Sequence, residues 1–170
     1  MKQRIIAIIG EAGSGKDTFA NMLSDYTGYP MLVSCTTRPM RPGEVNGREH
    51  IFISPRRRQE MGVLTDVLAY TVYGGYEYWA SQCQLHPDTT IYIIDEAGFE
   101  YFVDKHKDKY EFLAINIRRE IKEGVDATRT ARDKDRKTLP DEAFAFIVEN
   151  NHSLQELSHK ALDIAWKIKR

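Results

Sequence analysis

The apolar residues of this 170-residue chain fall into short runs that polar or glycine-rich segments separate. Five such runs lie at 5–9, 31–35, 90–94, 110–117 and 144–148, and a shorter one at 51–53. Short apolar runs bounded by glycine, proline or charged residues are typical of strands that are buried in a parallel sheet. The pattern therefore predicts several buried strands spread along the whole chain.

Between these runs, apolar residues recur at helical spacing. We expect helices from about Lys16 to Tyr26, over Phe99–His106 and over Ser153–Lys169, with a short helix over Arg56–Met61. In the last long helix we expect the leucines and Trp166 to face the core. Strands that alternate with helices predict an α/β fold, in which helices flank both faces of a parallel sheet.

Composition narrows the range of partners. Hydrophobic residues make up 42% of the chain, charged residues 29%, and the net charge is −1, which argues against a nucleic-acid polymer or a membrane as partner. No run approaches a membrane span, and the apolar run after Met1 is too short for a signal peptide. Cys35 and Cys83 lack metal-ligand spacing and indicate reduced thiols. We expect one cytoplasmic domain, of open oligomeric state.

The segment after the first run carries the clearest chemistry, the pattern Gly-x4-Gly-Lys from Gly10 to Lys16. A strand, a glycine-rich loop and a helix in this order predict a phosphate-binding loop. Glycines let backbone N–H groups converge on one anion, and the helix start adds its positive dipole end. Lys16 supplies a charge for the terminal phosphates of a nucleotide. We expect a bound nucleotide to contact Gly10, Ala12, Gly13, Ser14, Gly15, Lys16, Asp17 and Thr18.

The position after the lysine departs from the usual pattern. Asp17 stands where Ser or Thr normally holds Mg²⁺, and Thr18 follows it. Gly-Ser-Gly-Lys-x-Thr resembles the loop of nucleoside monophosphate kinases of the adenylate kinase type. That resemblance implies a metal that is held largely through water.

A second polar segment, residues 34–50, contains three arginines, two prolines and two glycines. This composition predicts a structured loop that carries cations, and the planar fork of arginine suits phosphate. The run Arg56-Arg57-Arg58, in contrast, we interpret as solvated surface.

Residues 36–47 read Thr-Thr-Arg-x-x-Arg-Pro-Gly-Glu-Val-Asn-Gly, almost letter for letter the nucleotide-binding segment of guanylate kinases. The chain as a whole resembles the guanylate kinase family. The resemblance implies that Ser34, Arg38 and Arg41 face the phosphate of an acceptor monophosphate. His50 stands where the family has a tyrosine on that phosphate, so it either keeps this contact or lies at a solvent-facing strand edge.

The tyrosine-rich stretch at 70–81 matches a Gly-Asn-Tyr-Tyr-Gly-Ser/Thr segment of the family. Gly74, Gly75, Tyr76 and Tyr78 fit it, with Glu77 inserted. The resemblance implies that Tyr76 and Tyr78 pack on the base or reach the phosphate. Core packing is the alternative.

One family residue is missing upstream of this stretch. Guanylate kinases place a glutamate there that pairs with guanine, whereas Leu68 or Ala69 aligns with it here. The nearest polar candidates are Asp66, Thr71 and Glu77. Because a buried polar contact of this kind sharpens base choice, the acceptor base stays open.

Asp95 directly follows the apolar run at 90–94. The family reads Asp-Ile-Asp-x-Gln-Gly here, and this chain has Ile93 in place of the first acid. A carboxylate at the end of a strand beside a phosphate-binding loop can organise Mg²⁺ and its waters. It also suits a helix N-cap. We expect Asp95 and Asp17 at the metal, and Asp95 near the substrate.

Residues 122–137 are strongly charged, and Arg129 and Arg132 are spaced to share one face of a helix. This segment resembles the lid of a nucleoside monophosphate kinase, in which arginines close over the transferring phosphoryl group. A solvated surface helix is the alternative.

Together the patterns and the resemblance imply a three-layer P-loop NTPase fold with a core at 1–34 and 85–170, an acceptor-binding insert at about 35–84 and a lid at about 120–138. The implied activity is Mg²⁺-dependent transfer of the ATP γ-phosphate to GMP or dGMP. The implied catalytic residues are Lys16, Arg38, Arg129 and Arg132.

Three alternatives stay open. The acceptor could be another (deoxy)nucleoside monophosphate or a small phosphorylated metabolite. A GTPase would need a guanine-specifying Asn-Lys-x-Asp, which we do not find. A guanylate kinase-like module that binds a phosphoprotein resembles the family but lacks the phosphate-binding loop.

Overall fold

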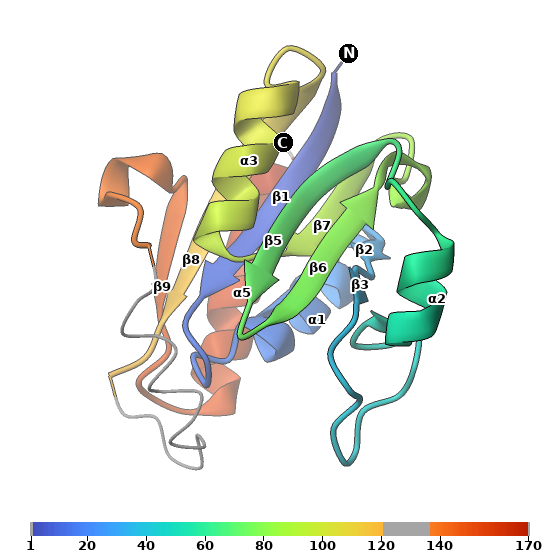
Figure 1. Ribbon diagram of the computed structural model, residues 1–170. Helices are drawn as coiled ribbons and strands as arrows, with labels where there is room; N and C mark the ends of the chain where they lie inside the picture. Colours follow the sequence, from blue (N-terminus) through green and yellow to red (C-terminus); the bar gives the residue numbers. More distant parts are fainter. Residues whose placement is uncertain (1, 121–136, 170) are drawn as a thin grey trace.

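The computed structural model describes residues 2–120 and 137–169, which form two β-sheets and their covering helices (Figure 1). The strands are β1 (Gln3–Gly10), β2 (Met31–Leu32), β3 (Cys35–Thr36), β4 (Ile51–Phe52), β5 (Val67–Tyr73), β6 (Tyr76–Ser81), β7 (Thr89–Ile93), β8 (Tyr110–Arg118) and β9 (Phe146–Glu149). The helices are α1 (Lys16–Thr27), α2 (Pro55–Glu60), α3 (Glu96–His106) and α5 (Leu154–Ile168), with 3-10 turns η1 (Gln82–Gln84) and η2 (Asp141–Ala143).

The main sheet has the strand order β2-β7-β1-β8-β9, and all its pairs are parallel. Its central strand β1 contains four isoleucines that are fully buried, because the sheet is covered on both faces. The expected parallel sheet is therefore confirmed. Since β1 lies between β7 and β8, the loop that follows it emerges in the middle of the carboxyl edge.

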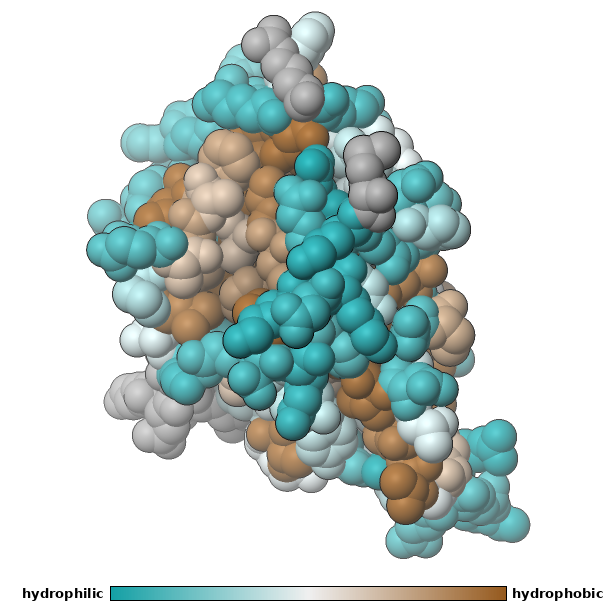
Figure 2. All heavy atoms as spheres, turned by 90° about the horizontal axis from the view of Figure 1, so that it is seen from above, coloured by the Kyte–Doolittle hydropathy of each residue, from teal (hydrophilic) through white to brown (hydrophobic). Residues whose placement is uncertain are grey.

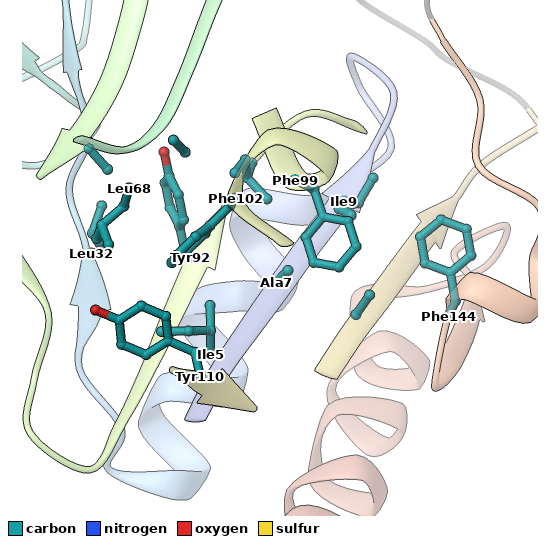
Figure 3. Packing of buried hydrophobic residues seen from close by; sticks show 14 residues of the cluster. Ile5, Ala7, Ile9, Leu32, Leu68, Tyr92, Phe99, Phe102, Tyr110 and Phe144 are labelled. Carbon is teal, nitrogen blue, oxygen red and sulfur yellow. The ribbon is translucent and has the colours of Figure 1, made fainter. Parts of the chain in front are cut away.

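Two hydrophobic cores lie on opposite faces of this sheet. The helix-side core packs α1 and α5 against one face, through residues such as Phe19, Leu23 and Leu157. The insert-side core packs α3 and the second sheet against the other face (Figure 3). It consists of Ile5, Ala7, Ile9, Leu32, Leu68, Ala69, Ala80, Tyr92, Ile94, Phe99, Phe102, Tyr110, Ala114 and Phe144.

Helix α5 turns a narrower face to the core than the sequence predicts. Leu157 is buried, but Leu154 and Leu162 are exposed, and Trp166 is 63% exposed. The expectation that all leucines and Trp166 are core residues is wrong. Successive members of this set are eight and four positions apart, so they line one outward stripe of the helix.

The second sheet has the strand order β4-β3-β6-β5. The run at 31–35, expected as one strand, is split: β2 pairs with β7 in the main sheet, and β3 pairs with β6 in the second. The chain thus passes between the sheets at Val33 and Ser34. The sequence analysis also missed the antiparallel hairpin of β5 and β6, whose turn is Gly74-Gly75.

Among the described residues, no helix has the length and apolarity needed to cross a bilayer. In the view of Figure 2, hydrophilic side chains border the hydrophobic areas of the surface.

Candidate functional site

The loop after β1 and the residue Asp95 after β7 lie at the same edge of the main sheet. Both strands are parallel neighbours, and Ile8 of β1 pairs with Ile93 of β7, so their carboxyl ends are level. In open α/β sheets this edge is where ligands bind. The sequence-based expectation that the loop and Asp95 are close is consistent with this register.

The loop between β1 and α1 turns tightly. Gly13 and Gly15 have φ of 75° and 90°, which side chains rarely adopt. Helix α1 starts directly after Gly15 and has no side-chain cap, so its first N–H groups point along the loop toward the edge of the sheet. The Lys16 ammonium donates to the Glu11 carbonyl over 3.3 Å. This geometry fits an anion at the helix start.

Two glycines of the loop are required by crowding. A Cβ on Gly10 would lie 2.5 Å from the Ile117 carbonyl oxygen and 2.6 Å from the Ser14 hydroxyl. A Cβ on Gly15 would lie 2.4 Å from the Asn150 side-chain nitrogen, which donates to the Ser14 carbonyl at 2.8 Å. Asn150 therefore supports the loop from the far end of the chain. The sequence analysis missed this role.

The candidate metal residues flank the loop. Asp17 and Thr18 lie in the exposed first turn of α1. Asp95 caps α3, because its Oδ1 accepts from the Gly98 N–H at 2.6 Å. In the described part of the chain, no three His, Cys, Asp or Glu side chains form a metal-binding cluster. These residues fit a Mg²⁺ that one or two carboxylates hold beside phosphate and water.

Arg38 is anchored by Glu44. The guanidinium makes two hydrogen bonds of 2.9 Å to the two oxygens of the carboxylate and is only 6% exposed. Burial alone would raise the pKa of Glu44, but hydrogen bonds from Arg38 and from the Arg41 N–H, with their charges, lower it below its ordinary value. The Arg38 guanidinium also lies over the Phe52 ring at 5.2 Å. The arginine is thus fixed without a ligand.

His50 completes a cluster with Ser34, Phe52 and Tyr78. Its Nδ1 is 3.0 Å from the Ser34 hydroxyl, and its ring packs edge-on against both aromatic rings. Burial and the charge of Arg38 lower the pKa of His50, so the imidazole is neutral at pH 7. An isolated β-bridge joins His50 to Asn46, directly before β4 begins at Ile51. His50 is half-buried, so a purely solvent-facing position is excluded.

Asp17 links this cluster to the loop. Its charge lies close enough to His50 to act on the titration of the imidazole. The start of α1 and the cluster of Ser34, Arg38, His50 and Tyr78 therefore border one region.

The hairpin sorts its polar residues onto two faces. Tyr76 and Tyr78 are two apart and share a face, and Thr71 pairs directly opposite Tyr78. This is the face that turns to His50. Ala69 lies on the same face, opposite Ala80, so alanine occupies the position two residues before Thr71.

Glu77 lies on the other face of the hairpin. Its Oε1 accepts from Arg58 and from the Tyr70 hydroxyl, each at 2.9 Å. Asp66 lines a groove on this side with Trp79 and Met61. Neither carboxylate reaches the face of Tyr78, which leaves Thr71 as the polar candidate for the base.

The same contacts correct the interpretation of the arginine run at 56–58. Arg56 and Arg57 are exposed, but Arg58 is half-buried and lies over the Trp79 ring at 5.6 Å. Arg58 is therefore part of the packing of the insert.

A cavity of about 400 Å³ opens beside the loop and the end of β8. Glu11, Glu96, Arg118 and Arg119 are among the residues that line it. Arg118 forms an ion pair with Asp141. The predicted lid arginines, Arg129 and Arg132, lie outside the described residues.

A phosphate-binding loop after the central strand of a β2-β7-β1-β8-β9 sheet, with helices on both faces, defines a P-loop α/β protein. A family model described as guanylate kinase matches residues 2–98, more than half of the chain. The chain belongs to the guanylate kinase family.

Relatives named guanylate kinase support this. That of Symbiobacterium thermophilum is 39% identical over 120 residues, which are 67% of this chain and 57% of the relative. That of Gloeobacter violaceus is 38% identical over 76 residues, 44% of this chain and 37% of the relative. The chain thus spans about one third to three fifths of these two relatives. A solved guanylate kinase of Anaplasma phagocytophilum has the same fold, with a TM-score of 0.71, 19% identity, and coverage of 98% of this chain and 86% of that one.

Proposed function

We propose that this protein is an ATP-dependent kinase that transfers the γ-phosphate of ATP to a nucleoside monophosphate, with GMP and dGMP as the first candidates. One observation carries the proposal. The phosphate-binding loop follows β1, and the cluster of Ser34, Arg38 and His50 begins two residues after β2, so both lie at the carboxyl edge of the same parallel sheet. A donor and an acceptor phosphate would meet there.

On the donor side, the backbone N–H groups from Gly13 to Lys16 and the start of α1 would cradle the phosphates of ATP. The Lys16 side chain would exchange its contact with the Glu11 carbonyl for the β- and γ-phosphates. Asn150 keeps the loop in this shape through the Ser14 carbonyl.

On the acceptor side, Arg38, Arg41, Ser34 and Tyr78 would hold the phosphate of the monophosphate. Glu44 holds Arg38 in position before a monophosphate binds. His50 in its neutral form donates one hydrogen bond and accepts another. The acceptor oxygen is already anionic at neutral pH, so the transfer needs positioning and charge neutralisation, without a general base.

Mg²⁺ supplies charge neutralisation between the phosphates when ATP is bound. We place it next to Asp95 and Asp17. Arg129 and Arg132 would add positive charge over the transferring group, from the segment at about 120–138 that we assign as lid. Residues 35–84 would form the acceptor-binding insert, and 1–34 with 85–170 the core.

The state of the two cysteines supports a proposal about the cellular compartment. Cys35 and Cys83 are both free thiols. We place the protein in a reducing cytoplasm, where such thiols persist.

The test is ADP release from ATP and Mg²⁺ with a panel of ribo- and deoxyribonucleoside monophosphates. We expect turnover with at least one monophosphate and a loss of at least about 100-fold in kcat/KM for Lys16→Ala. The control Lys167→Ala removes an exposed lysine that pairs with Asp163 of α5, and its activity should equal that of the wild type.

The outcomes separate the alternatives. Turnover with GMP or dGMP alone supports guanine as the base, and turnover with others shifts the assignment to a different nucleotide. No turnover with any monophosphate contradicts the proposed function.

A further inference from the structure

Asn150 reaches the phosphate-binding loop from the segment that joins β9 to α5. Its Nδ2 donates to the Ser14 carbonyl at 2.8 Å, across 136 positions of sequence. The partner is a carbonyl oxygen, so the amide nitrogen of the side chain has to make this bond. The contact therefore joins one peptide of the loop to the last part of the chain.

The backbone of Asn150 is itself held in place. Arg118 of β8 pairs with Glu149 of β9, and the Asn150 N–H donates to the Arg118 carbonyl at 2.7 Å. In the adjacent residue, the Asn151 Oδ1 accepts from the Glu120 N–H at 2.9 Å. The Asn150 side chain thus projects from a segment that hydrogen bonds tie to the end of β8.

Gly15 leaves the space that the Asn150 amide occupies. A Cβ on Gly15 would lie 2.4 Å from the Asn150 Nδ2. Because the same nitrogen binds the Ser14 carbonyl, Asn150 packs directly against the peptide that links Ser14 to Gly15. Any rotation of this peptide would break the hydrogen bond.

The bond to the Ser14 carbonyl has a consequence on the other side of the same peptide. No peptide bond among residues 2–120 and 137–169 is cis, so the Ser14 carbonyl and the Gly15 N–H lie in one trans plane and point in opposite directions. A carbonyl held toward Asn150 turns the Gly15 N–H away from Asn150. Gly15 has φ of 90°, as glycines have in backbone nests, where successive N–H groups bind one anion.

We propose that Asn150 is a positioning residue of the donor site, whose side-chain amide holds the Ser14 carbonyl and thereby keeps the Gly15 N–H directed at a donor phosphate. The inference rests on the proposed function. Glycine adopts many backbone angles, so the peptide before Gly15 can rotate unless a neighbour holds it. Without Asn150, part of the molecules would present this peptide in the wrong orientation, and the affinity for the donor would fall.

The test measures how the full chain binds two probes, the Mg²⁺ complexes of ADP and of inorganic tripolyphosphate, by isothermal titration calorimetry. We expect Asn150→Ala to raise the Kd of both probes roughly 10-fold, the effect of about one hydrogen bond. The two factors should be equal, because the Gly15 N–H faces linked phosphates that both probes contain. In turnover, the KM of ATP should rise, while the KM of the acceptor keeps its wild-type value.

Two further variants make the comparison specific. Asn150→Asp fills the same space, but its carboxylate only accepts hydrogen bonds, so its loss should equal or exceed that of the alanine variant. It also gives the answer if Asn150→Ala does not fold. Asn151→Ala is the matched control, because it removes the neighbouring side chain, which binds Glu120 instead of the loop. Its affinity for both probes should equal that of the wild type.

Weaker binding of Mg·ADP with unchanged binding of tripolyphosphate would overturn the inference, because Asn150 would then act on the nucleoside. Unchanged binding of both probes would overturn it as well. Either result leaves the proposed function standing, since neither depends on turnover. Absence of wild-type turnover with every monophosphate would contradict the proposed function, whereas absence of wild-type binding to both probes would overturn both.

Discussion

Among single residues, the ion pair of Arg38 and Glu44 has the largest part in shaping the proposed acceptor site. The pair fixes the position of the Arg38 side chain. Their side chains are 6% and 16% exposed, and the carboxylate also accepts from the Arg41 N–H at 2.7 Å. A bidentate pair of this kind leaves few orientations to the guanidinium. Under the proposed function, Arg38 is therefore oriented before the acceptor phosphate binds.

The pair makes stability depend on pH in a defined direction. The pKa of Glu44 is lower in the folded than in the unfolded protein, so its contribution is complete above its ordinary value of 4.5 and is lost as the pH falls through the folded value. We expect Glu44→Gln to lose about 2 kcal/mol of unfolding free energy at pH 7. The loss should shrink steadily below about pH 4.5, as urea unfolding at several pH values would show.

Glu60→Gln is the matched control, because Glu60 pairs with the exposed Arg56 and Arg57 on α2. Surface ion pairs contribute little to stability, so the unfolding free energy of this variant should differ from that of the wild type by less than about 0.5 kcal/mol at every pH. A pH-independent loss in Glu44→Gln would contradict the assigned role of the carboxylate charge.

Residues that act across long distances in sequence were beyond prediction from local patterns. Lys16 was predicted from the spacing of its motif, and Arg38 and Ser34 from the resemblance to a family segment; their roles in binding stay predictions. Asn150 contacts the loop from 136 positions away. No periodicity in one sequence records such a contact.

The β5–β6 hairpin shows the same limits at the scale of elements. Its turn is Gly74-Gly75, with φ of 59° and 79°. Two-residue hairpin turns need this left-handed backbone, which matches the twist of the strands. The pair is a recognisable turn signal, but the resemblance to the family implies substrate contacts for the flanking tyrosines and gives no sign of a hairpin.

A substitution in this turn tests the backbone requirement alone. A Cβ on Gly75 would meet no atom within 4 Å, so a change of stability cannot arise from crowding. We expect Gly75→Ala to lose about 1 kcal/mol of unfolding free energy in urea. Gly75→Asn should lose less, since asparagine tolerates positive φ better. Equal losses for both variants would argue against backbone strain as the cause.

Strands were easiest to predict where both faces of the sheet are buried. The apolar runs became β1, β7, β8 and β9, and the signal is strongest for β1, which is buried on both faces at the centre of the sheet. The run at 31–35 was misjudged because hydrophobicity does not reveal that a chain leaves one sheet for another. Helix α5 was placed correctly, but its exposed stripe was not, since periodicity alone does not say how wide a face the core accepts.

At the scale of the whole molecule, the insert-side core joins the two sheets. Leu68, Ala69 and Ala80 of the insert pack in one buried cluster with Ile5 and Phe102 of the main sheet and α3. A core shared in this way favours cooperative unfolding. The two parts should therefore lose structure together.

Tryptophan fluorescence can test this cooperativity. Trp79 is buried in the insert at 1% exposure, and the other tryptophan, Trp166, is exposed on α5. In a Trp166→Phe background, we expect the fluorescence of Trp79 and far-UV circular dichroism to report the same urea midpoint. Trp79 fluorescence that changes at a lower urea concentration would show that the insert unfolds before the core.

Gln84 holds together the two points at which the chain leaves and re-enters the main sheet. Its amide nitrogen donates to the Val33 carbonyl at 2.6 Å, and its amide oxygen accepts from the Ser81 N–H at 2.7 Å. The two ends of the intervening fifty or so residues are thus neighbours, as they are where one domain can be grafted into another. We therefore expect that this segment can be exchanged as a unit, provided that the replacement presents an apolar face to the insert-side core. Under the proposed function, such an exchange would replace the acceptor site and leave the phosphate-binding loop unchanged.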